Sequence, residues 1–235
     1  MSKFLTAKWV DLIMANYAVS PDLVADLIPK GTEPDIFEGT FYISLVSFKF
    51  RDTAVLGVPV PFHKDFEEIN LRFYVKRTLD EEIRRGVVFV KEIVPKSAVT
   101  WVARKLYGEP YETWTTWSEE DEDELTYFWE RGETENRIHV EIAENLGIPK
   151  SGSVEEFITE HYWGYTRRGE LRTDEYRVSH PKWEVYNVNY AEIEVDFGAT
   201  YGERFSVLNE TAPNSIFLAK GSDIVVYKGE HLRRK

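Results

Sequence analysis

The feature that most constrains the fold is a strict alternation of apolar and polar residues between Glu67 and Arg77. A β-strand sends successive side chains to opposite faces, so this segment has one apolar face and one polar face. The apolar face holds Ile69, Leu71, Phe73 and Val75, and the polar face holds Glu68, Asn70, Arg72, Tyr74 and Lys76. The segment therefore predicts a strand whose apolar face packs on a core.

Segments rich in β-branched and aromatic residues recur along the chain and are separated by glycine, proline and acidic turns. The predicted strands are 9–17, 39–50, 67–77, 87–94, 111–117, 125–131, 137–143, 162–166, 171–178, 183–197, 216–219 and 224–227. Three short helices are predicted after the N-cap residues Ser20, Ser97 and Ser153, the last of them running through His161. The acidic run from Glu119 to Glu124 is predicted to be a solvated loop, because its like charges would repel one another inside a packed site.

Many strands joined mostly by hairpins, with few helices between them, indicate an α+β, mostly β architecture. We expect an antiparallel sheet that curls or closes to protect its edges. No repeat, low-complexity segment or linker divides the chain, so residues 1–235 are predicted to form one domain.

Composition excludes several classes of function. A formal charge of −12 opposes binding to phosphate backbones, so no nucleic-acid partner is expected. The absence of cysteine excludes disulfides, thiolate nucleophiles and cysteine-based metal sites. Residues 1–10 lack the pattern of a secretory signal, and no later apolar run is long enough to span a membrane. We therefore expect a cytoplasmic protein without a membrane partner.

Motifs for metal and cofactor binding are also missing. The histidines show no spacing typical of a zinc site, and the chain has no glycine-rich phosphate loop, dinucleotide fingerprint or serine nucleophile elbow. We expect neither a metal nor a cofactor.

The first group of candidate binding residues is Glu68, Asn70 and Arg72, which follow one another on the polar strand face at intervals of about 7 Å. On an exposed sheet these three side chains would simply be hydrated by solvent and would form no binding site. Inside a closed barrel they would line a cavity and bind a small carboxylate or another polar ligand.

A second group comprises Arg104 and Tyr107, one helical turn apart, together with Tyr111. These residues would present a guanidinium and two phenols to an anionic ligand. The alternative is that Arg104 pairs with a surface carboxylate while both tyrosines pack in the core. His180, at a strand boundary, is a further candidate ligand residue, although a lone histidine is more often structural.

Six segments, in this order, resemble the YqjF-like family of uncharacterised bacterial proteins (domain of unknown function 2071). They are Trp9 with 16–19 and 27–29, then 37–44, 68–75, 86–89, 103–111 and 180–183. That family is similar in fold to the acetoacetate decarboxylase superfamily. The resemblance implies an acetoacetate decarboxylase-like fold, an antiparallel, cone-like barrel with flanking helices and an internal cavity.

The resemblance also shows a departure from the decarboxylases. In those enzymes a Schiff-base lysine follows a helix that ends in Tyr-Gly-x-Pro, and a second lysine beside it lowers its pKa. Here Tyr111 and Glu112 occupy the expected positions, and neither side chain can form an imine. Glu68 lies roughly where the decarboxylases keep an acidic residue. We therefore expect no Schiff-base decarboxylation.

Three functions remain open on the sequence alone. The leading hypothesis is a protein that binds a small acidic or amphipathic molecule in a barrel cavity through Arg72 and Arg104. The second is a cofactor-independent enzyme that uses Glu68 as acid or base, with an arginine stabilising an oxyanion. The third is a protein-interaction module whose aromatic surface docks a partner.

Overall fold

The computed structural model describes residues 1–59, 64–106, 108–169 and 172–232. Within these residues the strands form one sheet. They are β1 (Lys3–Val19), β2 (Glu33–Pro34), β3 (Phe41–Val55), β4 (Val58–Pro59), β5 (Phe66–Leu79), β6 (Glu82–Val94), β7 (Tyr111–Thr113), β8 (Thr115–Asp121), β9 (Glu124–Arg131), β10 (Thr134–Gly147), β11 (Trp163–Arg167), β12 (Thr173–Ser179), β13 (Val185–Glu194), β14 (Ser215–Tyr227) and β15 (Glu230–His231).

The helices are short. They are the α-helices α1 (Ser97–Leu106), α2 (Val154–Thr159) and α3 (Phe197–Tyr201), and the 3-10 helices η1 (Pro21–Leu27) and η2 (Glu203–Glu210). In the described part of the chain, no helix is long and apolar enough to cross a lipid bilayer. As predicted, Ser20 and Ser153 accept hydrogen bonds from backbone amides at the starts of η1 and α2.

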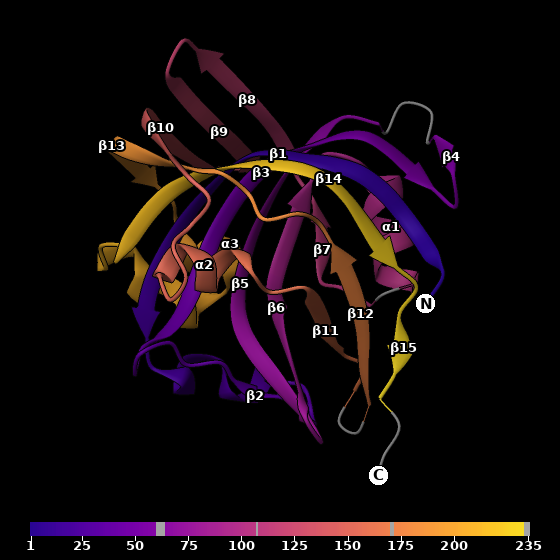
Figure 1. Ribbon diagram of the computed structural model, residues 1–235. Coiled ribbons are helices and arrows are strands. Elements are labelled where there is room, and N and C mark those ends of the chain that lie inside the picture. The colour runs from indigo at the N-terminus through magenta and orange to yellow at the C-terminus, as the bar shows by residue number, and fades with distance from the viewer. Residues whose placement is uncertain (60–63, 107, 170–171, 233–235) are drawn as a thin grey trace.

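The sheet closes into a ring. Its strands run in the order β12, β11, β6, β5, β3, β1 and β14, and β14 closes the circle by pairing with β12 at Val178↔Val226. Strands β13, β10, β9 and β8 continue from β14 and form a second layer, here called the wing (Figure 1). The predicted mostly β, closed architecture is therefore confirmed. Its antiparallel order has exceptions, because β6 pairs in parallel with both β7 and β11.

The alternation of β5 sorts its side chains between two cores. The apolar face of β5 packs outward against the wing. It belongs to a cluster that also contains residues of the ring strands β1 and β3, the wing strands β9 and β10, and η2. This outer core includes Ile13, Leu45, Ile69, Leu71, Phe73, Val75, Leu125, Tyr127, Trp129, Ile138, Val140 and Phe205. The other face of β5 points into the ring. The central ring strands consequently have no face open to solvent.

The inside of the ring is lined largely by aromatic and aliphatic side chains from the opposite faces of the same strands. They include Leu12, Met14, Val46, Phe48, Phe50, Phe66, Val87, Tyr176, Val178, Trp183 and Phe217. Leu12 and Ile13 illustrate the division, since these neighbours are both fully buried but belong to the inner and outer core respectively. Any polar residue on the inner face of β5 is thus enclosed by apolar neighbours.

The local structure differs from the sequence-based expectation at the acidic run. Glu119, Glu120 and Asp121 belong to β8 and Glu124 begins β9, so only two residues form the turn of this hairpin. At an exposed hairpin end, the carboxylates stay hydrated while the backbone continues the sheet. One of them also has a cation partner, because Lys49 of β3 forms an ion pair with Glu120.

Two other expectations were wrong near the C-terminus. The predicted strands 216–219 and 224–227 are not separated by a turn but form the continuous strand β14. Gly221 lies between them with φ at +80°, and an added Cβ there would lie 1.9 Å from the carbonyl oxygen of Trp9. The predicted strand 183–197 stops at Glu194, and Asp196 caps α3 by accepting a hydrogen bond from the amide of Ala199. The capping carboxylate of Asp196 favours the start of a helix here over a longer strand.

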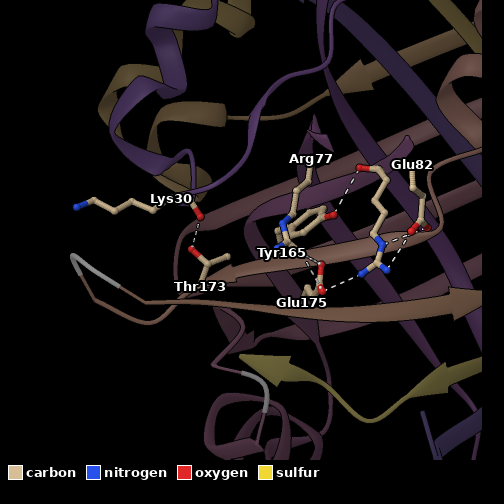
Figure 2. Close-up of polar contacts among 7 residues, drawn as sticks. Lys30, Arg77, Glu82, Tyr165, Thr173 and Glu175 are labelled. Atoms are coloured by element: carbon tan, nitrogen blue, oxygen red, sulfur yellow. Dashed lines mark hydrogen bonds and ion pairs between the residues drawn. The ribbon is translucent and has the colours of Figure 1, made fainter. Parts of the chain in front are cut away.

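One end of the ring is held by a buried carboxylate. Glu175 of β12 is 7% exposed and accepts hydrogen bonds from Arg77 of β5, at 3.0 Å, and from Arg84 of β6, at 2.9 Å. Figure 2 shows the two guanidinium groups converging on this carboxylate beside Tyr165 of β11. Because β11 lies between β12 and β6 in the sheet, these ion pairs join strands that are not neighbours.

Replacing this carboxylate should destabilise the ring. We expect Glu175→Gln to lower the free energy of unfolding by about 3 kcal/mol, because the partly buried Arg77 loses its ion pair and Arg84 keeps only its ion pair with the exposed Glu82. Urea denaturation measures the change. The control is Glu194→Gln, which removes a carboxylate paired with Arg137 on the exposed surface and should cost less than about 1 kcal/mol. Equal losses in the two variants would contradict a special role for Glu175.

Candidate functional site

The ring encloses a cavity of about 380 Å³. This volume is within the range of about 300–1,000 Å³ that is typical of small-molecule sites. Its apolar wall includes Trp9, Phe48, Phe50, Phe66, Phe89, Trp163 and Trp183. Its polar lining comprises Glu68, Asn70, Arg72, Glu92, Glu109, Tyr111, Thr159, His161, Tyr176 and His180, with Thr53 nearer the N-terminal strand. The cavity is therefore amphipathic, with much more apolar than polar surface.

The predicted row on β5 lies inside this cavity. Glu68, Asn70 and Arg72 are 2%, 1% and 9% exposed, so the solvated alternative does not apply to them. The amide Nδ2 of Asn70 donates a hydrogen bond to Oε1 of Glu68 at 3.1 Å. The geometry on which the candidate site depended is present, since the carboxylate, amide and guanidinium turn toward one hollow.

Tyr111 joins this row from the neighbouring strands. It begins β7, which pairs in parallel with β6 and places Tyr111 beside Glu92. The phenol hydroxyl donates to Oε2 of Glu68 at 2.9 Å and also hydrogen-bonds to Glu92. Tyr111 thus connects two carboxyl groups on β5 and β6.

Arg104 lies on the other side of the same segment. It is exposed, and its Nε donates to the backbone carbonyl oxygen of Tyr111 at 2.6 Å. It is not among the described residues that line the cavity. The predicted grouping of Arg104 with Tyr111 is therefore present, but through the backbone rather than around a shared ligand space. Tyr107, the third member of that predicted group, lies outside the described residues.

Two cavity carboxyl groups were not anticipated from the sequence. Glu92 is 3% exposed and faces inward because a register shift in the β5–β6 ladder follows the pair Leu71↔Lys91. Glu109, 5% exposed, precedes β7, and its Oε1 accepts a hydrogen bond from Thr166 at 2.6 Å. The only sequence signal for Glu109 was its place between Gly108 and Pro110, which resembles an ordinary solvated turn.

Burial changes the acidity of these groups. It raises the pKa of Glu68 to about 7, although the hydrogen bonds from Asn70 and Tyr111 and the charge of Arg72 act in the opposite direction. Burial also raises the pKa of Glu109 to about 7. The pKa of Glu92 is raised well above its usual range by burial and by the charges of Glu109 and Glu68. At neutral pH the interior therefore holds exchangeable protons.

The two histidines of the cavity differ from each other. His180 stacks on Trp183 with ring centroids 4.0 Å apart, and burial lowers its pKa to about 4, so it is neutral at pH 7. His161, which was not predicted as a site residue, has its Nε2 3.1 Å from Asp35. Burial lowers the pKa of His161 as well. The Nδ1 of His161 has no hydrogen-bond partner within the described ranges.

Neither a metal site nor a cavity amine is found in the described ranges. No group of three or more histidine, aspartate or glutamate side chains there is arranged to hold a metal ion. No described lysine lines the cavity; Lys105 is exposed on α1, with its ammonium 4.7 Å from the Trp101 ring centroid. Glu112, the residue after Tyr111, pairs with Lys91 and Arg131.

Comparison with known proteins places the chain in a family. The model of the DUF2071 family, described as an uncharacterized conserved protein, matches residues 6–223. The chain belongs to the DUF2071 family. The uncharacterized protein YqjF of Bacillus subtilis (strain 168) is 24% identical to it over 224 residues, which cover 93% of this chain and 88% of the relative. The resemblance seen in the sequence is thereby confirmed.

Solved structures confirm the fold of this DUF2071 protein. An acetoacetate decarboxylase from Legionella pneumophila aligns with a TM-score of 0.70 at 11% identity, over 99% of this chain and 88% of the other. The enduracididine biosynthesis enzyme MppR aligns with a TM-score of 0.72 at 11% identity and the same coverage. An acetoacetate decarboxylase-like enzyme from Sphingomonas wittichii RW1 gives 0.66 at 11% identity, over 99% and 94%. The fold is therefore acetoacetate decarboxylase-like.

The raised pKa of Glu109 predicts a pH-dependent stability. Because the folded protein holds this proton more tightly than the unfolded chain, the contribution of Glu109 to stability falls as the pH rises from about 4.5 to about 7. Glu109→Gln removes this loss. We expect the free energy of unfolding of the variant, minus that of the wild type, to increase between pH 5 and pH 8 in denaturation experiments.

The control for this measurement is Glu194→Gln. The hydrogen bond with Arg137 lowers the pKa of Glu194, so this carboxyl group is already ionised throughout the range from pH 5 to pH 8. The difference between this variant and the wild type should not rise over the same pH range. A flat difference for Glu109→Gln would show that Glu109 does not titrate in this range.

Proposed function

We propose that this DUF2071 protein binds a small amphipathic molecule inside the ring, with the polar head of the ligand at Arg72 and its apolar body against the aromatic wall. The observation that carries the proposal is a set of buried polar atoms that have no hydrogen-bond partner among the described residues: Nε of Arg72, Oδ1 of Asn70 and Oε2 of Glu92. All three side chains line the cavity. Buried polar atoms are nearly always hydrogen-bonded in folded proteins, so unpaired ones beside a cavity support a ligand site.

Arg72 gives the site its preference for an acidic or carbonyl-bearing head. Among the described residues that line the cavity, it carries the only permanent positive charge. Its guanidinium carbon lies 5.7 Å from the centroid of the Tyr74 ring, which orients the group. A carboxylate or carbonyl oxygen of a ligand would complete the hydrogen bonds of Arg72. Hydrogen bonds donated by a charged group are stronger than those between neutral groups.

A second function is favoured by one further observation, the chain of hydrogen bonds from Glu92 through Tyr111 to Glu68. We infer that this chain would let the cavity act as an acid–base enzyme. With a pKa of about 7, Glu68 is suited to take or give a proton at neutral pH, and Arg72 would stabilise a developing oxyanion. Such a reaction needs no imine, so borohydride should trap no adduct with acetoacetate.

The binding proposal is tested with two matched substitutions. Straight-chain carboxylates (hexanoate, octanoate and decanoate) should raise the melting temperature of the wild type, because they bind only the folded state. Arg72→Met should abolish the shift. Arg104→Met, the same change outside the cavity, should retain it. The proposal fails if the two variants respond alike, or if no carboxylate shifts the wild type.

The enzymatic alternative has its own readout. Turnover of a panel of keto acids should be measurable in the wild type and lost in Glu68→Gln, which keeps the size of the side chain but cannot exchange a proton as a carboxyl group. The control is Glu67→Gln, the adjacent carboxylate, which contacts Ser118 of the wing at 3.1 Å. Ligand binding without turnover would contradict the enzymatic alternative and leave the binding proposal standing.

A further inference from the structure

Two unpaired acceptors lie side by side on adjacent strands of the ring. Asn70 on β5 and Glu92 on β6 are directly paired in the antiparallel ladder, which places their Cβ atoms about 5 Å apart. Oδ1 of Asn70 and Oε2 of Glu92 are both buried, and neither has a hydrogen-bond partner in the part of the chain that the structure describes. A single donor group on a ligand can therefore reach both oxygens.

The hydrogen-bond network fixes which atoms are acceptors. The amide nitrogen of Asn70 donates to Glu68, so the oxygen of this amide is the atom left over. Tyr111 has one hydroxyl proton and donates a hydrogen bond to Glu68. Its hydrogen bond with Glu92 lowers the pKa of that carboxyl group, as a donated bond does, so Glu68 and Glu92 share the one hydroxyl proton. Oε2 of Glu92 has no partner within the described ranges and is a bare acceptor in the carboxylate form.

An unpaired donor completes the pattern. Nε of Arg72 is two residues from Asn70 along β5, about 7 Å away at the backbone. Long side chains bring such neighbours close, so the ligand head meets two acceptors and, next to them, one cationic donor. A simple carboxylate pairs only with Arg72. A simple amine pairs only with the two acceptors.

We propose that the ligand is an amino acid with a long apolar side chain, whose carboxylate binds Arg72 and whose amino group donates to Asn70 and Glu92. This inference rests on the proposed binding function and names its ligand class. An ammonium group has enough protons for both acceptors, whereas a hydroxyl group has one. The carboxylate of Glu68 beside them also attracts a cation. The apolar side chain would fill the aromatic part of the cavity.

The test uses four ligands with the same carbon chain: 2-aminooctanoate, 2-hydroxyoctanoate, octanoate and octylamine. Isothermal titration calorimetry measures the dissociation constant of each for the wild type. We expect 2-aminooctanoate to bind at least about tenfold more tightly than the other three, because each of them leaves at least one of the buried groups unpaired.

Substitutions at Glu92 assign the effect to its oxygen. Glu92→Met removes the acceptor and should weaken 2-aminooctanoate to the level of octanoate, while octanoate itself keeps its affinity. Glu92→Gln should preserve the preference, because its amide can donate to Tyr111 and still turn an oxygen to the cavity. Glu141→Met, on the exposed face of β10, is the control and should change neither affinity.

The outcomes separate this inference from the proposed function. If octanoate or 2-hydroxyoctanoate binds as tightly as 2-aminooctanoate, or if Glu92→Met weakens all four ligands equally, the amino-acid assignment is overturned while ligand binding in the cavity stands. If none of the four binds the wild type, both proposals fail. Unliganded melting temperatures of the variants establish that each is folded at the temperature of the titration.

Discussion

The closed sheet and the wing together remove both faces of β5 from water. An ordinary surface strand sends its polar side chains to solvent, but the ring leaves β5 without a solvated face. The polar residues of β5 are consequently forced into an apolar interior, where water cannot supply their hydrogen bonds freely. They bond to one another and to residues of β6 and β7 instead. The polar cluster is thus a direct result of closing this particular strand into a ring.

The far side of the cavity depends on close approach between strands. At Gly164 of β11, an added Cβ would lie 2.1 Å from the ring of Tyr176, its antiparallel partner on β12. Only glycine therefore allows Tyr176 to lie across β11. In that position its hydroxyl hydrogen-bonds to Glu109, which Thr166 also contacts. The absence of a side chain at Gly164 thus allows Tyr176 to hold the carboxyl group of Glu109, which faces β5 and β6 across the cavity.

The alternation in 67–77 was enough to predict that Glu68, Asn70 and Arg72 share one strand face, because side chains alternate with a period of two. Whether that face points to solvent or into a cavity was left open by the sequence and depends on how the sheet closes. Glu92 was beyond such reasoning, since the run Val87 to Val94 does not alternate and the register shift that turns Glu92 inward is set by pairing with β5. The ends of most strands were predicted within a few residues. The wing was predicted as strands, but its position over the ring depends on long-range packing that no local pattern contains.

Tyr111 shows how one residue can serve two surfaces. Outside the ring its carbonyl oxygen is held by Arg104 of α1, and inside the ring its phenol joins Glu68 to Glu92. Within the described residues, the interior network leaves Asn70 and Glu92 each with a bare oxygen and Arg72 with an unpaired Nε. Unsatisfied buried atoms cost about 1–3 kcal/mol each, and proteins retain such costs mainly where a site needs them. Buried polar atoms without partners also occur outside the cavity in the described part of the chain, on Thr116, Trp129 and Tyr201. What sets Asn70 and Glu92 apart is that both side chains line the same cavity as Arg72, where a ligand can supply the missing protons.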